Sequence, residues 1–357
     1  MDLVITERTG NLLEAEADAL VNTVNTVGVM GKGIALQFKK AFPDMFKAYK
    51  AACDRGEVNL GTVHVFETGQ MSPRYVLNFP TKGHWRARSR LDDIETGLKD
   101  LVATIEELDI TSIAVPPLGC GHGGLEWDEV RPRIVAALEP LSQVEVLLYP
   151  PAGAPAAADI VMHTTRPKMT PGRAALVALL HNYGQRAAEV SLIEVQKLMY
   201  FLQEAGQPLK LRYAKDRYGP YADNLRHVLH TVEGHFLMGY GDASKTVHAS
   251  EPIRVLPDGI AEAAALVESD KDLQTDIDRV LTLVEGFESA YALELLATVH
   301  WVTTREVEPG VGPAMIAELV AKWNRRKARM FGESHVTTAW EHLGDEGWLQ
   351  QPSRPAA

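Results

Sequence analysis

The fold of the first half of the chain is decided by one stretch, DALVNTVNTVGVMGKGIA at residues 18 to 35. An apolar strand pattern ends in Asn22 and Asn25, continues through three glycines and opens into a helical pattern at Gly33. Glycines let backbone N–H groups approach an anion closely, and the N-terminus of a helix adds partial positive charge. Asparagine at a strand end offers a donor and an acceptor to hydroxyl groups. The stretch therefore predicts a strand, a diphosphate site and a helix, or else a turn that merely joins the two elements.

The residues around this stretch, 1 to 150, alternate between strand-like and helix-like patterns, which is typical of a sheet with helical crossovers. One helical pattern repeats Ile94, Leu98, Leu101 and Ile105 at spacings of three and four, which gives a single apolar face. We expect a three-layer α/β domain. The expected strands are 3–6, 19–22, 63–66, 75–79, 113–116 and 144–149, and the expected helices are 33–42, 43–55, 91–108 and 126–141.

A second glycine-rich loop, PPLGCGHGGLEW at residues 116 to 127, also follows an apolar strand pattern and precedes a helical one. In an open α/β sheet, the loops after parallel strands lie on the same edge and form a crevice. We therefore expect the two glycine loops to hold a diphosphate from both sides.

A third loop, NFPTKGHWRARSR at residues 78 to 90, follows another strand pattern and is expected at the same edge. It combines an aromatic ring with several cations, a pairing that suits single-stranded nucleic acid. We expect His84, Trp85, Arg86 and Arg88 to bind nucleic acid, with Lys82 between them and the strand. The alternatives are a solvated lysine and a basic loop that caps the next helix.

Together these motifs resemble the macrodomain, an ADP-ribose-binding fold, over residues 1 to about 150. The resemblance rests on GNL at 10–12, DALVN at 18–22 and the loops 25–33 and 117–124. More closely, MGKGIALQFKKAFP, NFPTKGHWR and PPLGCGHGGLEW are similar to the macrodomain of the DarG antitoxin family. In that family a DarT toxin attaches ADP-ribose to bases of single-stranded DNA and the antitoxin removes it. The resemblance implies a three-layer α/β/α mixed sheet and a DNA ADP-ribosyl glycohydrolase.

The resemblance also implies that Lys82 is catalytic, because the matching lysine is catalytic in the DarG-like group and in the similar human terminal ADP-ribose glycohydrolase. A lysine can attack the ribose as a free amine, or stay charged and stabilise the departing base. Attack needs a lowered pKa, which Lys32 can provide by repulsion. Both roles stay open, and the expected catalytic residues are Lys82, Asn25 and His122.

The expected ADP-ribose contacts come from the four matching segments. They are Asn11, Leu12, Asn22, Asn25, Gly31, Lys32, Gly33, Ile34, Thr81, Pro117, Leu118, Gly119, Cys120, Gly121, His122, Gly123 and Gly124. Two positions depart from related families: Asn11 replaces an aspartate that binds adenine, and Gly123 replaces an aspartate of the human enzyme. His122, Glu126 or the substrate's own phosphate is then expected to act as general base. No metal and no cofactor is expected.

The stretch 150–173 is rich in proline, alanine and glycine, which indicates a linker. We expect a macrodomain at 1–151, a linker at 152–170 and a second domain at 171–357. Helical spacing dominates the second domain, which is therefore expected to be mainly α-helical. Its expected helices are 174–183, 191–205, 222–229, 259–267, 273–284, 290–302, 315–323 and 336–343.

Two motifs of the second domain, LIEVQKLMYFL at 192–202 and YGPY at 218–221, resemble a helical domain of antitoxins and phage-associated proteins. In the first motif, Leu192, Val195, Leu198 and Leu202 predict one buried stripe. YGPY either exposes aromatic rings on a rigid bend as an anchor for a protein partner, or closes a helix. We expect this domain to hold the cognate DNA ADP-ribosyltransferase toxin.

The last segment, 336–349, looks like a winged-helix fragment. It follows Arg325, Arg326, Lys327 and Arg329 but lacks the concentrated basic residues of a DNA reader, so we expect a packing role.

Composition limits the class of protein. Of the 357 residues, 46% are hydrophobic and 23% charged, so neither half need be disordered. No apolar run approaches the roughly 20 residues of a membrane span, and MDLVITERTG lacks the order of a secretion signal, so a cytoplasmic protein is expected. A net charge of −11 argues against coating nucleic acid, and DNA contact therefore requires a local basic patch. Two cysteines are too few for a disulfide framework.

Two rival functions fit the same motifs. One is an ADP-ribose reader that binds without hydrolysis, and the other is a hydrolase that removes ADP-ribose from proteins.

Overall fold

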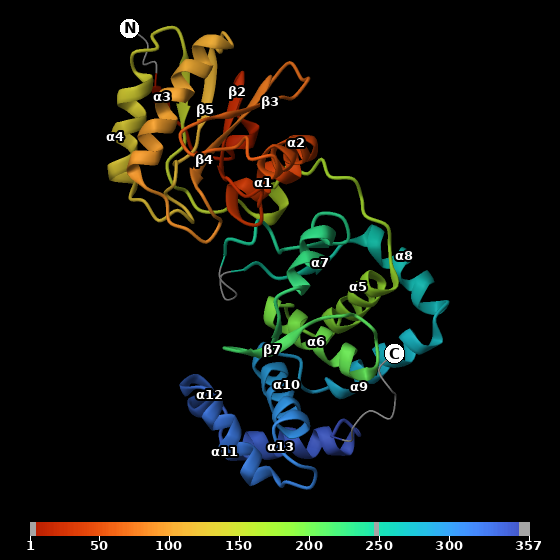
Figure 1. Ribbon diagram of the computed structural model, residues 1–357. Coiled ribbons are helices and arrows are strands. Elements are labelled where there is room, and N and C mark those ends of the chain that lie inside the picture. Colours follow the sequence, from red (N-terminus) through yellow and green to blue (C-terminus); the bar gives the residue numbers. More distant parts are fainter. Residues whose placement is uncertain (1–4, 246–249, 350–357) are drawn as a thin grey trace. The chain divides into compact units, whose positions relative to one another are not determined.

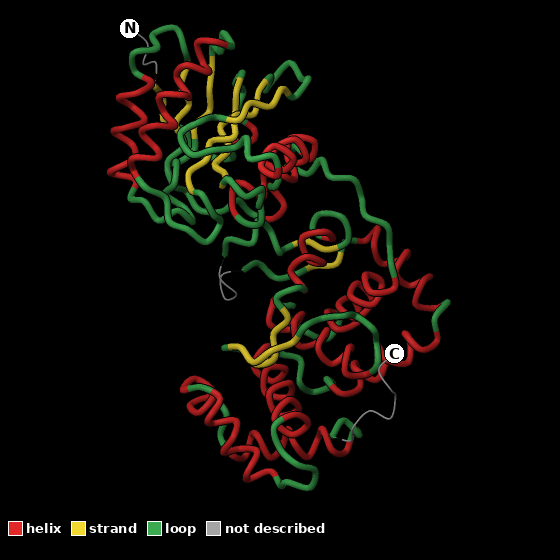
Figure 2. Tube along the Cα trace, in the orientation of Figure 1, coloured by secondary structure: helices red, strands yellow, loops and turns green. Residues whose placement is uncertain are grey.

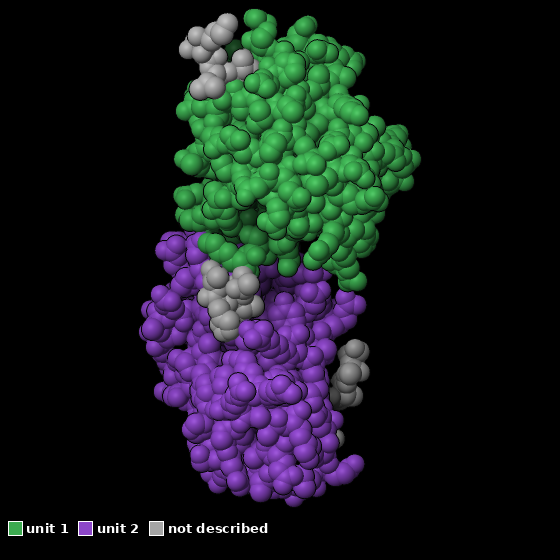
Figure 3. All heavy atoms as spheres, turned by 90° about the vertical axis from the view of Figure 1, so that its left-hand side faces the viewer, with its two compact units in different colours: residues 1–165, 241–245 green, residues 166–240, 246–357 purple. Residues whose placement is uncertain are grey.

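The computed structural model describes residues 5–245 and 250–349 and forms two compact units, which Figure 3 colours separately. The first unit comprises Met1–Thr165 and Gly241–Lys245, and the second comprises Arg166–Tyr240 and Thr246–Ala357. The segment Gly241–Lys245 thus lies in the second half of the sequence but packs with the first unit.

The first unit is built on a six-stranded sheet, of which Figure 1 labels β2, β3, β4 and β5. The strand order is β1-β6-β5-β2-β4-β3. All neighbouring strands are parallel except β3, which pairs antiparallel with β4 at one edge. The strands are β1 Ile5–Glu7, β2 Ala19–Asn25, β3 His64–Glu67, β4 Tyr75–Lys82, β5 Ser112–Val115 and β6 Glu145–Leu148. The strand expected at 3–6 is described only from Ile5, because residues 3 and 4 lie outside the described part of the chain.

Helices cover both faces of this sheet. Helices α1 Gly33–Ala41 and α2 Pro43–Asp54 pack on one face, and α3 Leu91–Glu107 and α4 Trp127–Leu138 pack on the other. Side chains of successive strand residues point to opposite faces, so Leu20 joins the α1–α2 core while Val21 joins the α3–α4 core. The expected three-layer α/β/α fold with a mixed sheet is confirmed.

Two 3₁₀ helices complete the first unit, η1 Leu12–Glu14 and η2 Ala157–Asp159. The second lies in the stretch that the sequence assigns to the linker. There Ala157 and Ile160 are buried, and the main-chain N–H of His163 donates to Lys40 O at 2.9 Å. Residues 152–165 therefore pack as part of the first unit.

The second unit is mainly helical, as expected and as Figure 2 shows. Its helices are α5 Pro171–Gly184, α6 Leu192–Ala205, α7 Leu225–Val232, α8 Pro257–Glu268, α9 Lys271–Leu283, α10 Ala290–Arg305, α11 Pro313–Trp323, α12 Arg325–Met330 and α13 Glu333–Asp345. Helix α6 lies at the centre of the core and is buried all round rather than along one stripe. Its Tyr200 hydroxyl and His300 Nδ1 are 2.8 Å apart, which satisfies both buried groups.

One alternative and one helix start expected in the second unit are wrong. The alternative that YGPY closes a helix is wrong, because these residues belong to a hairpin of β7 Tyr213–Asp216 and β8 Gly219–Ala222, in which Gly219 has a φ of +92° that suits glycine. A rigid bend that anchors a partner stays a prediction. The helix expected from residue 222 begins at Leu225, because Ala222 pairs with Tyr213 in the hairpin. A further strand pair joins β9 Leu237–Met238 to β10 Arg254–Val255.

The packing role expected for the last segment is confirmed. Trp348, which follows α13, is 3% exposed, and its ring centroid lies 5.4 Å from that of Phe201. None of the helices within residues 5–245 and 250–349 has the length and apolar character of a membrane span.

Candidate active site

The first and third loops meet where β2 and β4 end. The parallel register pairs Asn25 with Lys82 after an irregularity at Val24, so the two strands deliver these side chains to the same edge. Beyond the strands, the Thr26 hydroxyl donates to Gly83 O at 2.7 Å. This hydrogen bond joins the first loop, which follows Asn25, to the third loop, which follows Lys82.

Asn25 supports loop one from inside. Its side-chain amide donates to Val29 O at 2.6 Å, and its Oδ1 accepts from the amides of Val27 and Val29 at 3.1 and 3.3 Å. Its main-chain carbonyl accepts from the Tyr49 hydroxyl. Because its side chain is 5% exposed and already bonded, Asn25 positions the loop in this structure.

The second glycine loop presents unpaired amides. Gly119 and Gly124 adopt left-handed φ values of +73° and +75°, and the Leu125 amide closes the loop by donating to Gly119 O at 3.1 Å. Within residues 5–245 and 250–349, the amides of Gly121, His122 and Gly123 donate to no protein acceptor. They form a cluster of donors suited to an anion.

Lys82 lies against this second loop. Its Nζ donates to His122 O at 3.0 Å, and burial lowers the pKa of its amine. The sequence suggested Lys32 as the cause, whereas desolvation is the physical reason here. Lys32 instead acts on His122, whose pKa is lowered by burial first and then by Lys32 and Lys82.

His122 joins the second loop to the first. A Cβ added to Gly33 would lie 3.6 Å from His122 Cδ2, so the imidazole stands over the start of α1. The three loops therefore converge on Lys82, His122 and Gly33, which combine an amine, an imidazole and backbone donors.

Gly123 has no room for the aspartate that the human enzyme carries at the matching position. A Cβ there would lie 2.3 Å from both Gly119 O and Ser89 Oγ, and the Ser89 amide donates to Gly123 O at 3.0 Å. The loop is closed against Ser89, so no aspartate side chain fits here, and a general base elsewhere stays a prediction. His122 and Glu126, both exposed, are the residues of this loop with a suitable side chain.

One residue at this edge was missed by the sequence reasoning. Asp242 is 4% exposed, and its carbonyl accepts the Gly33 amide at 2.9 Å. Its Oδ2 accepts from Gln37 Nε2 at 2.8 Å, and the neighbouring Gly241 O accepts from Lys40 Nζ at 3.0 Å. Gly241–Lys245 therefore binds the first turn of α1, where the diphosphate was expected, and no local sequence pattern signals a contact so distant along the chain.

The expected ADP-ribose contact residues, taken together, divide by exposure. Those that lie at the surface or half-buried are Asn11, Gly31, Lys32, Gly33, Ile34, Pro117, Cys120, Gly121, His122 and Gly124. Those that are buried are Leu12, Asn22, Asn25, Thr81, Leu118, Gly119 and Gly123.

Several members of this set contact the scaffold in this structure. Asn22 donates to Asn78 Oδ1 at 2.9 Å inside the sheet, far from solvent. Asn11, although half-buried, caps η1 by accepting from the Leu13 amide and donates to Asp159 O at 3.1 Å. Burial raises the pKa of Cys120 to about 11, so its thiol stays protonated at neutral pH.

The residues expected to bind nucleic acid are all exposed. The guanidinium of Arg86 lies 4.4 Å from the centroid of the Trp85 ring, which is 39% exposed, and His84 packs beside the same ring at 5.4 Å. Arg88 makes no ion pair within the described part of the chain. The loop thus offers an indole and two exposed guanidinium groups next to Lys82.

Comparisons with known proteins agree with this geometry. The Macro domain family model matches residues 21–134. The chain is 48% identical over 342 residues to the DNA ADP-ribosyl glycohydrolase of Thermus aquaticus, covering 96% of this chain and 93% of the relative. It is 45% identical to the enzyme of the same name from Mycobacterium tuberculosis, covering 95% of this chain and 99% of the relative. A DNA ADP-ribosyl transferase-DNA ADP-ribosyl glycohydrolase fusion protein from Thermosipho africanus is 36% identical over 158 residues, 40% of each chain.

Proposed function

Because this chain belongs to the DNA ADP-ribosyl glycohydrolase family, we propose that it hydrolyses the N-glycosidic bond between ADP-ribose and a base of single-stranded DNA. The observation that supports the active site is the contact between Lys82 Nζ and His122 O beside the unpaired amides of the second glycine loop. An amine with a lowered pKa stands next to an anion site at the edge of the sheet.

In this proposal the backbone holds the substrate and the side chains act on it. The amides of Gly121, His122 and Gly123 bind the diphosphate and present the distal ribose to Lys82, and the first turn of α1 joins them when Asp242 O releases the Gly33 amide. Hydrolysis breaks the bond from C1″ to the base, adds the oxygen of water to C1″ and returns a proton to the base.

Because its pKa is lowered, Lys82 has a larger fraction of free amine at neutral pH than an ordinary lysine has. The amine then attacks C1″ of the ribose, and water releases the adduct. His122, whose pKa is also lowered, is largely neutral at pH 7 and accepts a proton from that water. The single-stranded DNA that carries the modified base binds to His84, Trp85, Arg86 and Arg88. We place this activity in the cytoplasm.

The test is release of ADP-ribose from an ADP-ribosylated oligonucleotide by wild type and by Lys82→Ala, with Lys99→Ala as an exposed control on α3. Removing the catalytic amine is expected to slow release at least about 100-fold, while Lys99→Ala remains like wild type. A wild type that binds ADP-ribose but releases none makes the protein a reader. Faster release from an ADP-ribosylated protein than from DNA makes it a protein-directed hydrolase.

We further propose that the second unit binds the DNA ADP-ribosyltransferase toxin that modifies the substrate. In its support, the relative from Thermosipho africanus joins a transferase and a glycohydrolase in one chain. The full chain with Lys82→Ala separates binding from hydrolysis. This variant is expected to copurify with the toxin and to protect cells that express it. Loss of copurification would leave hydrolysis as the only means of neutralisation.

A further inference from the structure

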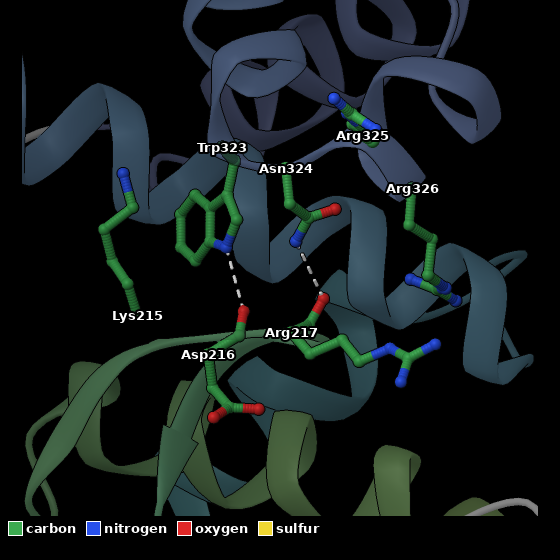
Figure 4. A pocket seen from close by; sticks show the side chains of 7 residues that line it. All are labelled: Lys215, Asp216, Arg217, Trp323, Asn324, Arg325 and Arg326. Atoms are coloured by element: carbon green, nitrogen blue, oxygen red, sulfur yellow. Dashed lines mark hydrogen bonds between the residues drawn. The ribbon is translucent and has the colours of Figure 1, made fainter.

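The second unit contains a basic cavity that the proposed active site does not use. It has a volume of about 500 Å³ and lies between the β7–β8 hairpin and the corner that joins α11 to α12 (Figure 4). Four cations line it, Lys215, Arg217, Arg325 and Arg326. The acidic residue of the lining, Asp216, turns its carboxylate away from Trp323 (Figure 4).

The walls of this cavity are held in place by side chains that bind the hairpin backbone. Trp323 Nε1 donates to Asp216 O at 2.8 Å, and Asn324 Nδ2 donates to Arg217 O at 3.2 Å, as the dashed lines in Figure 4 show. The positions of the hairpin cations relative to those of α12 are therefore fixed before any ligand binds, which reduces the entropy lost on binding.

The lining cations differ in their partners. Lys215 pairs with Glu306 at 2.8 Å, and Arg326 pairs with the buried Glu294. Arg217 and Arg325 make no ion pair among residues 5–245 and 250–349. The Arg217 guanidinium lies 5.4 Å from the centroid of the Tyr218 ring, a contact that uses none of its N–H groups, so two guanidinium groups of the lining can still bind an anion.

Two buried lysines lie beside the residues that line the cavity. Lys327 shares the carboxylate of Glu294 with Arg326, and in the described part of the chain Lys197 donates to a neutral acceptor, Pro220 O, at 2.6 Å. Burial and mutual repulsion lower the pKa of Lys197 to about 7, and burial lowers that of Lys327 to about 8. An anion in the cavity would favour the protonated forms of both amines, because a nearby negative charge raises the pKa of a lysine.

We propose that this cavity binds the phosphate backbone of single-stranded DNA. Guanidinium groups match the paired oxygens of a phosphodiester, and two of them are free to do so. Lys215 Nζ lies 4.2 Å and Lys327 Nζ 5.3 Å from the centroid of the Trp323 ring, so cations take the place of a stacked base and we expect sequence-independent binding. The choice of DNA over an acidic protein rests on the proposed function, because the substrate strand extends beyond the modified base.

The experiment measures binding of a fluorescent oligothymidine of roughly 15 nucleotides to the full chain by anisotropy at several salt concentrations. Arg217→Ala/Arg325→Ala is compared with Arg254→Ala/Lys271→Ala, which removes two exposed cations outside the cavity. The first pair is expected to weaken binding about 10-fold at low salt and to reduce the slope of log K against log salt by about 1.4, or about 0.7 for each phosphate that is no longer neutralised. The control pair should change neither quantity beyond about twofold.

The proposal fails if both double variants bind the oligonucleotide alike while their thermal unfolding matches that of wild type. It also fails if polyglutamate of equal charge displaces the probe as well as unlabelled oligothymidine does, because an acidic protein segment is then the ligand. In both cases release of ADP-ribose continues, which separates this failure from a failure of the glycohydrolase assignment.

Discussion

Replacing Gly123 by alanine tests whether the tight shape of the second glycine loop creates the anion site. The added Cβ would start 2.3 Å from Gly119 O, whereas ordinary contact begins near 3.4 Å, so the two must separate by about 1.1 Å. Ser89 Oγ, also at 2.3 Å, can rotate away, but Gly119 O is main chain and holds the Leu125 amide. The loop itself must therefore move, at a cost of about 1–3 kcal/mol in overpacking.

A shift of this size displaces the amides of Gly121 and His122 from a bound diphosphate. A hydrogen bond to a charged group contributes about 1.5–3 kcal/mol, so the loss of one weakens binding roughly 10- to 100-fold. Titration calorimetry with free ADP-ribose measures this change, and thermal unfolding measures the strain.

Gly312→Ala is the control outside the site, because a Cβ there meets no atom within 4 Å and its φ is −80°. It should bind ADP-ribose as wild type does. Equal ADP-ribose affinity of Gly123→Ala and Gly312→Ala would refute the argument that the second glycine loop binds the diphosphate through its shape.

Three further outcomes are expected. Because burial lowers the pKa of Lys82 and the protonated amine cannot attack, the rate at saturating substrate should rise with pH and level off below the ordinary lysine value of 10.5; a rate that falls over this range would assign the charged, stabilising role. Asp242→Ala removes the carboxylate that Gln37 and Ser244 hold, which should release Gly33 and tighten ADP-ribose binding about 5-fold by calorimetry, and weaker binding would make the segment a support of the site. Trp85→Ala should weaken oligothymidine binding at least about 5-fold with ADP-ribose affinity unchanged, and equal oligothymidine affinity would exclude stacking on this ring.

The first unit was predictable because its signals are local. Leu20 and Val21 point to opposite faces, so an uninterrupted apolar run predicts a strand covered on both sides, and glycines at the strand ends predict the loops. The convergence of Lys82 and His122 follows from the rule that parallel strands deliver their loops to one edge. The sequence pattern does not report how much of each side chain remains accessible. It therefore does not predict that Asn22 and Asn25 are buried.

In the second unit, alternation is weak and tertiary contacts decide the structure. The hairpin strand Tyr213–Asp216 has the burial pattern of one half-buried residue followed by three exposed ones, so it shows no apolar period to distinguish it from a loop. Its place is set by Trp323 and Asn324, more than 100 residues away, which bind its backbone. A pattern of single residues cannot report such pairs.

Asp242 shows what this means for function. The glycines of loop one predict where an anion can bind, since they shape the backbone within a few residues of Gly33. Whether the Gly33 amide is available depends on the main-chain carbonyl of Asp242, which accepts a hydrogen bond from it. The side chain of Asp242 accepts from Gln37, which lies 205 residues earlier in the sequence. The capacity to bind ADP-ribose is thus encoded locally, whereas the affinity of the full chain also depends on how tightly Gly241–Lys245 holds the first turn of α1. A macrodomain cut from this chain lacks Gly241–Lys245, and we therefore expect it to bind ADP-ribose more tightly than the whole protein does.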